Sequence, residues 1–166
     1  MLAFCTQVLV GYLYANLVEW LYHRYIQHGL GKKRGSRFRT HWKDHHGVVR
    51  RNGYYDDSYK FSGVMEDPMR EIFELLVGAL IHAPLFYVFP YFAGYLWFHA
   101  LLYFMIHRKS HLDPEWAKRW APWHYDHHMG KNQDANWCVT PPLWDYILGT
   151  RLYFLASKDY NNHTNK

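Results

Sequence analysis

Cysteine is nearly absent from this chain, which has 2 cysteines in 166 residues. Cys5 lies in an apolar stretch and Cys138 in a polar C-terminal region, so neither a disulfide framework nor a C-x-x-C site is indicated. A Rossmann glycine fingerprint, a heme attachment motif and an iron–sulfur cysteine set are also missing from the sequence. Any redox chemistry in this chain would therefore take its electrons from another protein.

Basic side chains are absent from two long parts of the chain. All 19 Lys and Arg residues lie in two blocks, 24–70 and 108–166, and none lies in residues 1–23 or 71–107. Membrane proteins keep their basic segments on the cytoplasmic side, so this segregation is typical of a membrane protein. The formal net charge of +5 suits a surface against anionic lipid headgroups better than nucleic acid, and we expect no nucleic-acid partner.

The first apolar stretch, residues 2–22, contains a single charge, Glu19. Its length matches the ~20 residues that a helix needs to cross a bilayer. It has no basic n-region and does not end in a small-residue cleavage site, so we expect an uncleaved helix and not a signal peptide.

The second apolar stretch, residues 72–106, is interrupted near its middle by Pro84 and Pro90. One straight helix of this length would span about 52 Å, too long for a bilayer, so we expect a hairpin of two short helices that turns near Pro90. His82 and His99 lie inside this hairpin, and we favour hydrogen bonds between helices for both of them over a functional role.

These stretches predict an all-α integral membrane protein, as a single domain over residues 1–166. We expect about three membrane helices and a cytoplasmic helical cap.

Histidine is abundant, and 10 of the 13 histidines lie in four spaced boxes: H-x-x-x-x-H, H-x-x-x-H-H, H-x-x-x-H and H-x-x-H-H. The box histidines are His23, His28, His41, His45, His46, His107, His111, His124, His127 and His128. Imidazoles a helical turn apart project from one face and can reach a common ion. Because zinc takes about four ligands and an octahedral metal about six, this number of histidines predicts two metals.

The charge pattern places these boxes together. The first helix would deliver His23 and His28 to the basic side, the hairpin would deliver His107 and His111 there, and the other boxes lie in the basic blocks themselves. We therefore expect all ten at the cytoplasmic face of the membrane. A non-enzymatic membrane metal-binding or transport protein is the alternative, although it should place its histidines through the membrane as a pathway.

Three polar features accompany the boxes. Glu19 precedes His23 by four residues and either orients its imidazole or lies as a carboxylate at the membrane interface. Residues 29–40 carry five basic side chains and form a surface loop that ends in Thr40, a candidate helix cap. Residues 47–68 are either the rim of a substrate site or a solvated connection.

A further motif follows the last box. It reads N-x-x-x-x-x-P-x-W-D-x-x-x-G-T and consists of Asn136, Pro142, Trp144, Asp145, Gly149 and Thr150. Together with the boxes HRYIQH, HWKDHH, HRKSH and WHYDHH, this motif resembles the fatty acid hydroxylase superfamily, the membrane di-iron enzymes that include sterol desaturases and carotenoid ring hydroxylases. The resemblance covers most of the chain. Two features depart from the family pattern: one apolar segment precedes His23 where members commonly have another, and Cys138 stands where glycine is frequent.

The resemblance implies two iron ions held by the ten box histidines, O2 as cosubstrate, and hydroxylation or desaturation of an unactivated C–H bond in a lipid such as a fatty acyl chain or a sterol. We expect no catalytic side chain beyond the metal ligands, and His82, His99 and His163 outside the ligand set. A separate ferredoxin or b-type cytochrome would supply electrons by docking on basic side chains. Zinc can replace iron in recombinant protein. A neighbouring subunit or lipid is expected to cover the face that an additional helix would occupy.

Two other enzyme classes are alternatives. A carotenoid ring hydroxylase, which is also short and has an HR-x-x-x-H first box, is the alternative within the superfamily, but the W-D-x-x-x-G-T ending favours the fatty acid and sterol branch. A zinc hydrolase is disfavoured because the sequence has no H-E-x-x-H and no general base beside a box.

Overall fold

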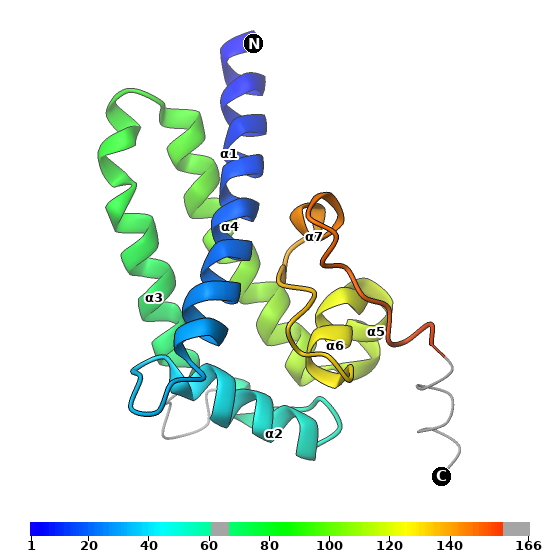
Figure 1. The fold of residues 1–166 in the computed structure, drawn as a ribbon. Coiled ribbons are helices and arrows are strands. Elements are labelled where there is room, and N and C mark those ends of the chain that lie inside the picture. The colour runs from blue at the N-terminus through cyan, green and yellow to red at the C-terminus, as the bar shows by residue number, and fades with distance from the viewer. Residues whose placement is uncertain (61–66, 158–166) are drawn as a thin grey trace.

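The computed structural model describes residues 1–60 and 67–157, which form helices and loops with no strand among them. The long helices are α1 (Leu2–Leu21), α3 (Asp67–Ile81) and α4 (Pro90–Leu112). A short helix, η4 (Ala83–Tyr87), joins α3 to α4, and these two helices run antiparallel beside α1 (Figure 1). The predictions of an all-α fold and of a hairpin that turns near Pro90 are confirmed.

Helix α1 packs closely on α4. A Cβ atom on Gly11 would lie 3.0 Å from Cβ of Tyr95, so glycine at this position allows the two helices to approach each other. The Gln7 side-chain oxygen accepts hydrogen bonds from the backbone nitrogens of Tyr91 and Phe92, at 3.1 and 3.3 Å. These are amides that the start of a helix leaves without a partner inside the helix.

Both isolated histidines of the hairpin bond to α1, as predicted. Nε2 of His99 lies 3.0 Å from the Glu19 carboxylate, and Nε2 of His82 lies 3.0 Å from the Tyr14 hydroxyl. These contacts tie the hairpin to the first helix at two levels along its length.

The expectation that Glu19 orients His23 is wrong, and the place of Glu19 relative to the membrane interface stays a prediction. Its carboxylate is buried, and it accepts hydrogen bonds from the backbone nitrogens of Val139 and Thr140 and from the Thr140 hydroxyl, in addition to facing His99. A buried carboxylate requires several donors, and these come from a distant loop that crosses α1. The adjacent His23 is oriented by a different group, described below.

One helical run, α1 continued by η1 (Tyr22–Leu30), is long and apolar enough to cross a membrane, with a mean hydropathy of 1.2. In the described ranges, length and composition identify this single span, whereas the sequence predicts about three. The hairpin helices do not meet the same criteria, because α3 has 15 residues and α4 contains many Tyr, Trp and His residues. Both nevertheless expose large apolar side chains, including Leu80 and Leu101.

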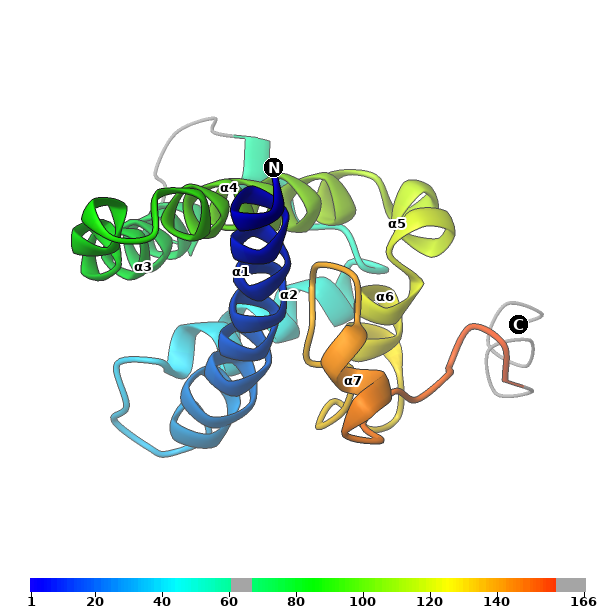
Figure 2. The same cartoon turned by 90° about the horizontal axis from the view of Figure 1, so that it is seen from above.

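Shorter helices surround the ends of α1 and α4 that lie away from the hairpin turn (Figure 1). They are η2 (Thr40–His45), α2 (His46–Arg51), η3 (Asp57–Lys60), α5 (Pro114–Trp120), α6 (Pro122–Met129) and α7 (Leu143–Ile147). Figure 2 shows α6 and α7 beside α1, on the side opposite α3. Helices therefore carry the second and fourth boxes, as predicted, and the cytoplasmic location of this cap stays a prediction.

Proline explains the starts of three helices, and one prediction about a helix start is wrong. Proline is the first residue of α4, α5 and α6, a position where its missing N–H costs nothing. Thr40 does not cap the helix of the second box, because no side-chain cap bond exists there. Its hydroxyl instead accepts a hydrogen bond of 3.2 Å from Arg70 of α3.

Candidate metal centre

Two π-helices bring together histidines that are five residues apart, a spacing that an α-helix would not place on one face. His23 and His28 are five residues apart, and the segment that contains them, η1, is a π-helix, in which hydrogen bonds close five residues along the chain. The two imidazole centroids therefore lie only 4.9 Å apart. The second box begins in another π-helix, η2, and the rings of His41 and His46 lie 5.1 Å apart.

The ten box histidines come together in two adjoining clusters. Within each cluster, the candidate ligand atoms all lie within 4.8 Å of one another. The first cluster consists of His23, His28, His41, His46 and His127. The second cluster consists of His45, His107, His111 and His128. His124 borders the second cluster, because its Nε2 lies 3.2 Å from Nε2 of His111. The clusters meet where the rings of His46 and His128 lie 4.2 Å apart.

The spacing of the ring nitrogens fits bound metal ions. Two nitrogens that each lie about 2.0–2.1 Å from one ion are about 2.9–3.4 Å apart at octahedral or tetrahedral angles. Neighbouring Nε2 atoms are 3.0–3.2 Å apart in the pairs His23–His41, His28–His46, His46–His127, His107–His111 and His111–His124. The donor set therefore fits metal ions in both clusters.

Unpaired buried nitrogens support the same conclusion. Among the described residues, Nε2 of His45 and both ring nitrogens of His128 are buried without a hydrogen-bonding partner. Leaving such an atom unsatisfied costs ~1–3 kcal/mol. A metal ion in the second cluster, to which both residues belong, would give Nε2 of His45 and one ring nitrogen of His128 a partner, so this cluster can hold a metal ion.

Backbone carbonyl groups hold the outer nitrogens of three cluster histidines. The Nδ1 atoms of His23, His127 and His111 donate to the carbonyl oxygens of Trp137, Ala135 and Tyr54, at 2.6, 2.7 and 3.1 Å. Because a carbonyl only accepts, each of these rings carries its proton on Nδ1 and turns the lone pair of Nε2 toward the cluster.

Carboxylates hold three more histidines in the same way. Nδ1 of His45 lies 3.2 Å from Asp56, Nδ1 of His107 lies 2.9 Å from Glu71, and Nδ1 of His28 lies 3.4 Å from Asp134. Contacts of this kind set the tautomer of a metal-binding histidine and raise its basicity.

Several of the box histidines are held in their neutral form. Burial lowers the pKa of His41, His46, His124, His127 and His128 well below its usual range, and the neighbouring imidazoles lower it further. Neutral imidazole is the form that binds metals, so these side chains are available as ligands at neutral pH.

The C-terminal motif holds the loop that supplies two of the carbonyl groups. Asp145 accepts hydrogen bonds from the backbone nitrogens of Trp137 and Cys138, both at 2.9 Å, and from the Thr150 hydroxyl at 2.6 Å. Asn136 has a φ of 58°, and its side-chain oxygen accepts from the backbone nitrogen of Leu152 at 2.8 Å. Asn tolerates this left-handed conformation better than most residues. The motif thus acts on the clusters through the backbone.

Sequence reasoning placed the ten histidines but missed the groups that orient them. Asp56 lies in the sequence YYDD shortly after the second box, where a carboxylate near histidines was a detectable signal. The carbonyl groups of Ala135 and Trp137 have no side-chain signal. As predicted, His82 and His99 lie outside both clusters, while His163 falls outside the described residues.

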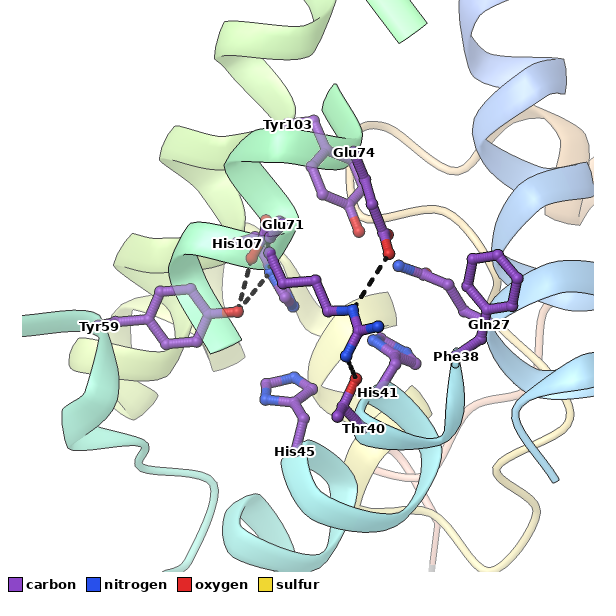
Figure 3. A pocket seen from close by; sticks show the side chains of 11 residues that line it. Gln27, Phe38, Thr40, His41, His45, Tyr59, Glu71, Glu74, Tyr103 and His107 are labelled. Atoms are coloured by element: carbon purple, nitrogen blue, oxygen red, sulfur yellow. Dashed lines mark hydrogen bonds and ion pairs between the residues drawn. The ribbon is translucent and has the colours of Figure 1, made fainter. Parts of the chain in front are cut away.

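A pocket opens onto both clusters (Figure 3). It is lined by Gln27, Phe38, Thr40, His41, His45, Tyr59, Arg70, Glu71, Glu74, Tyr103 and His107. His41 belongs to the first cluster, and His45 and His107 belong to the second. Tyr59 comes from the segment 47–68, so the described part of this segment contributes to the wall of the pocket.

Comparison with known proteins identifies one family. The family model described as Fatty acid hydroxylase matches residues 8–150, a range that contains all four boxes and the C-terminal motif. No curated protein and no solved structure matches the chain.

Proposed function

Because the chain belongs to the fatty acid hydroxylase family, we propose that it is a membrane di-iron oxygenase that hydroxylates or desaturates an unactivated C–H bond of a lipid. The family is membrane-associated, and its membership implies an oxidoreductase. The observation that carries the proposal is the pair of adjoining histidine clusters, with their ring nitrogens at ligand spacing and a pocket that reaches both.

One iron ion would be held by each cluster, and His124 is available to the second. Bound there, the two irons would supply the activation of O2 that no protein side chain can perform. The chain itself orients imidazoles through their Nδ1 contacts and excludes bulk water from the centre, since all of the cluster histidines except His41 are buried.

The remaining components would come from outside the chain. Hydroxylation places one atom of O2 in the C–H bond and reduces the other to water, which requires an electron pair and protons from a separate reductant. The exposed basic residues Lys33, Arg34 and Arg37 follow the first box directly and suit the docking of an acidic ferredoxin or b-type cytochrome.

The proposed placement has α1, α3 and α4 in the membrane and the clusters at its cytoplasmic face. It is supported by the exposed apolar side chains of these helices and by the confinement of Lys and Arg to residues 24–70 and 108–166.

The test compares His127→Ala with His82→Ala and His163→Ala. His127 belongs to the first cluster, so its loss should reduce bound metal and lower lipid oxidation by more than the ~10- to 100-fold typical of changes outside the ligand set. The two control variants should retain both properties, and all three should insert into membranes normally. Metal content would be measured by mass spectrometry, and oxidised lipid would be followed with reductant and O2 supplied. Normal activity of His127→Ala at equal expression would overturn the proposal.

A further inference from the structure

One stretch of the chain outside the long helices carries almost no charge. Residues 136–150 consist of a loop and α7, and their single charged residue, Asp145, is buried. Three consecutive apolar side chains of this stretch, those of Tyr146, Ile147 and Leu148, are 56%, 57% and 45% exposed. Contiguous exposed apolar side chains mark a surface that a protein or a membrane covers. The surroundings of α7 decide between these two.

Hydrogen bonds attach α7 and its loop to the middle of α1. The Trp144 indole nitrogen donates to the Leu13 carbonyl oxygen at 2.9 Å, and the Asn16 side chain donates to the Thr140 hydroxyl at 2.8 Å. At ~1.5 Å per residue, Leu13 lies about 16 Å along the helix from Arg24, the first basic residue of the chain. In Figure 1, α7 lies nearer to the middle of α1 than α6 does. Where α1 crosses a bilayer, α7 therefore lies at the depth of the acyl chains.

Buried carboxylates satisfy the backbone of the loop before α7. Asp145 accepts hydrogen bonds from the first two backbone nitrogens of residues 137–140, and Glu19 accepts from the other two. The next two residues, Pro141 and Pro142, have no backbone N–H. Water would satisfy the same nitrogens in a solvated loop at no cost in buried charge. The use of two buried carboxylates is typical of a loop that water does not reach.

The rest of the segment also finds acceptors within the protein. The backbone nitrogen of Trp144 donates to the Asn16 side chain at 3.4 Å. Five further backbone nitrogens donate to carbonyl oxygens inside the segment, those of Leu143, Tyr146, Leu148, Gly149 and Thr150. At membrane depth, non-helical backbone is tolerated only where the protein satisfies its polar groups. The loop and α7 meet this requirement.

Lipid fits the exposed face of α7 better than a protein partner does. The apolar exposure continues from α7 onto α1, where Leu13 and Leu9 are 36% and 58% exposed. A protein that covered α7 would also have to cover this part of α1, which the proposed function places in the bilayer. Acyl chains cover both surfaces without any further component.

We infer that residues 136–150 form a re-entrant membrane segment, in which Tyr146, Ile147 and Leu148 lie among the acyl chains of the leaflet next to the metal clusters. The inference rests on the membrane placement in the proposed function and adds this segment to α1, α3 and α4. Because the Trp137 carbonyl of the same segment accepts a hydrogen bond from His23, the first cluster then lies at the boundary of the hydrocarbon.

Fluorescence quenching in lipid nanodiscs tests the inference without turnover. Ile147→Cys is labelled with an environment-sensitive fluorophore in the full chain carrying Cys5→Ser, since the remaining Cys138 is buried. Lipids with a spin label on the acyl chain should remove most of the fluorescence, whereas iodide in the aqueous phase should remove little. Leu148→Cys gives a second exposed position should the first variant fail to fold, and circular dichroism compares the helix content of each variant with that of the wild type.

Two matched labels calibrate the measurement. Leu101→Cys, at a 57% exposed position of α4, should be quenched by the spin-labelled lipid. Asp57→Cys, at an exposed position of η3, should be quenched by iodide. The labels on α7 should behave like the label on α4.

Each other outcome contradicts a defined part of the account. Iodide quenching on α7 together with lipid quenching at Leu101→Cys would overturn this inference alone. Labels on α7 that neither quencher reaches would mean that a protein or a second copy of the chain covers the helix, which also overturns it. Iodide quenching at Leu101→Cys would contradict the membrane placement in the proposed function, and the inference would fall with it.

Discussion

At the scale of single residues, the partners of the outer imidazole nitrogens decide which nitrogen faces the metal centre. His45 is the clearest example: its Nδ1 lies 3.2 Å from the buried Asp56 carboxylate, while its Nε2 is buried without a partner among the described residues. Glu71 holds His107 similarly and also accepts from the Tyr59 hydroxyl at 2.6 Å. Carboxylates that bind no metal themselves therefore contribute to the ligand geometry.

Asp56→Asn is expected to weaken metal binding by about 10- to 100-fold, because the neutral amide supports the His45 imidazole less well than a carboxylate does. Asp57→Asn, at the exposed neighbouring position, is the matched control and should bind metal normally. Competition with a chromogenic chelator measures both affinities. Equal affinities of Asp56→Asn and the wild type would show that this contact does not support the centre.

At the scale of elements, α6 and the C-terminal segment hold each other in place. Arg151 forms a buried ion pair of 2.8 Å with Asp126, whose other oxygen accepts from the backbone nitrogen of Leu155 at 2.8 Å. Asp126 lies between His124 and His127 in α6, so the ion pair anchors the helix that carries the last box.

Arg151→Met is expected to destabilise the folded protein by ~3–5 kcal/mol, because it leaves the buried Asp126 carboxylate without its cation. The double variant Asp126→Leu/Arg151→Met should recover part of this loss, since no buried charge is left unpaired. Lys109→Met, which removes an exposed ion pair with Asp113, should cost less than ~1 kcal/mol. Denaturant unfolding in detergent micelles compares them, and similar losses for Arg151→Met and Lys109→Met would contradict this account.

At the scale of the whole molecule, apolar and metal-binding chemistry are separated along α1 and α4. The hairpin end exposes large apolar side chains, such as Leu9, Leu80 and Phe98, whereas the opposite end buries the histidine clusters within short helices (Figure 1). This division matches a molecule with one end in lipid and a water-excluding metal centre at the surface.

Leu80→Arg is expected to impair membrane insertion, because Leu80 is 59% exposed on α3 near the hairpin turn and a charged side chain is unfavourable in the hydrocarbon core. Leu152→Arg introduces the same charge at a 46% exposed position in the C-terminal segment and should insert normally. The amount of protein that resists alkaline carbonate extraction measures insertion. Equal extraction of the two variants would place α3 outside the membrane.

The metal-free protein is expected to lose stability as the pH falls. Burial keeps residues such as His41, His46 and His128 neutral in the folded protein by lowering their pKa, whereas the unfolded chain takes up protons below a pKa of ~6.5. Their contribution to stability is therefore complete above ~6.5 and is lost below it, at ~1.4 kcal/mol per pH unit for each such histidine. Chelator-treated protein unfolded in denaturant at a series of pH values tests this. Stability that is constant or rises toward acid pH would contradict it.

The sequence by itself determined the features that depend on residues close together in the chain. The apolar run 72–106 with its central prolines predicted the hairpin, because such a run has to bury its length or turn back. The spacing of the boxes predicted convergent histidines, which the two clusters confirm, while the membrane face at which they gather stays a prediction. These signals are readable because each depends on residues a few positions apart or on composition along one segment.

Only the tertiary structure decided how the histidines are divided between the first and the second cluster. The second box is split, with His41 and His46 in the first cluster and His45 in the second, because consecutive residues of a helix project in different directions and the two neighbouring clusters meet at this helix. The carbonyl oxygen of Trp137 that orients His23, 114 residues away in sequence, comes from a loop with no side-chain signal of its role. Such long-range contacts depend on how separate elements pack, which no local spacing specifies.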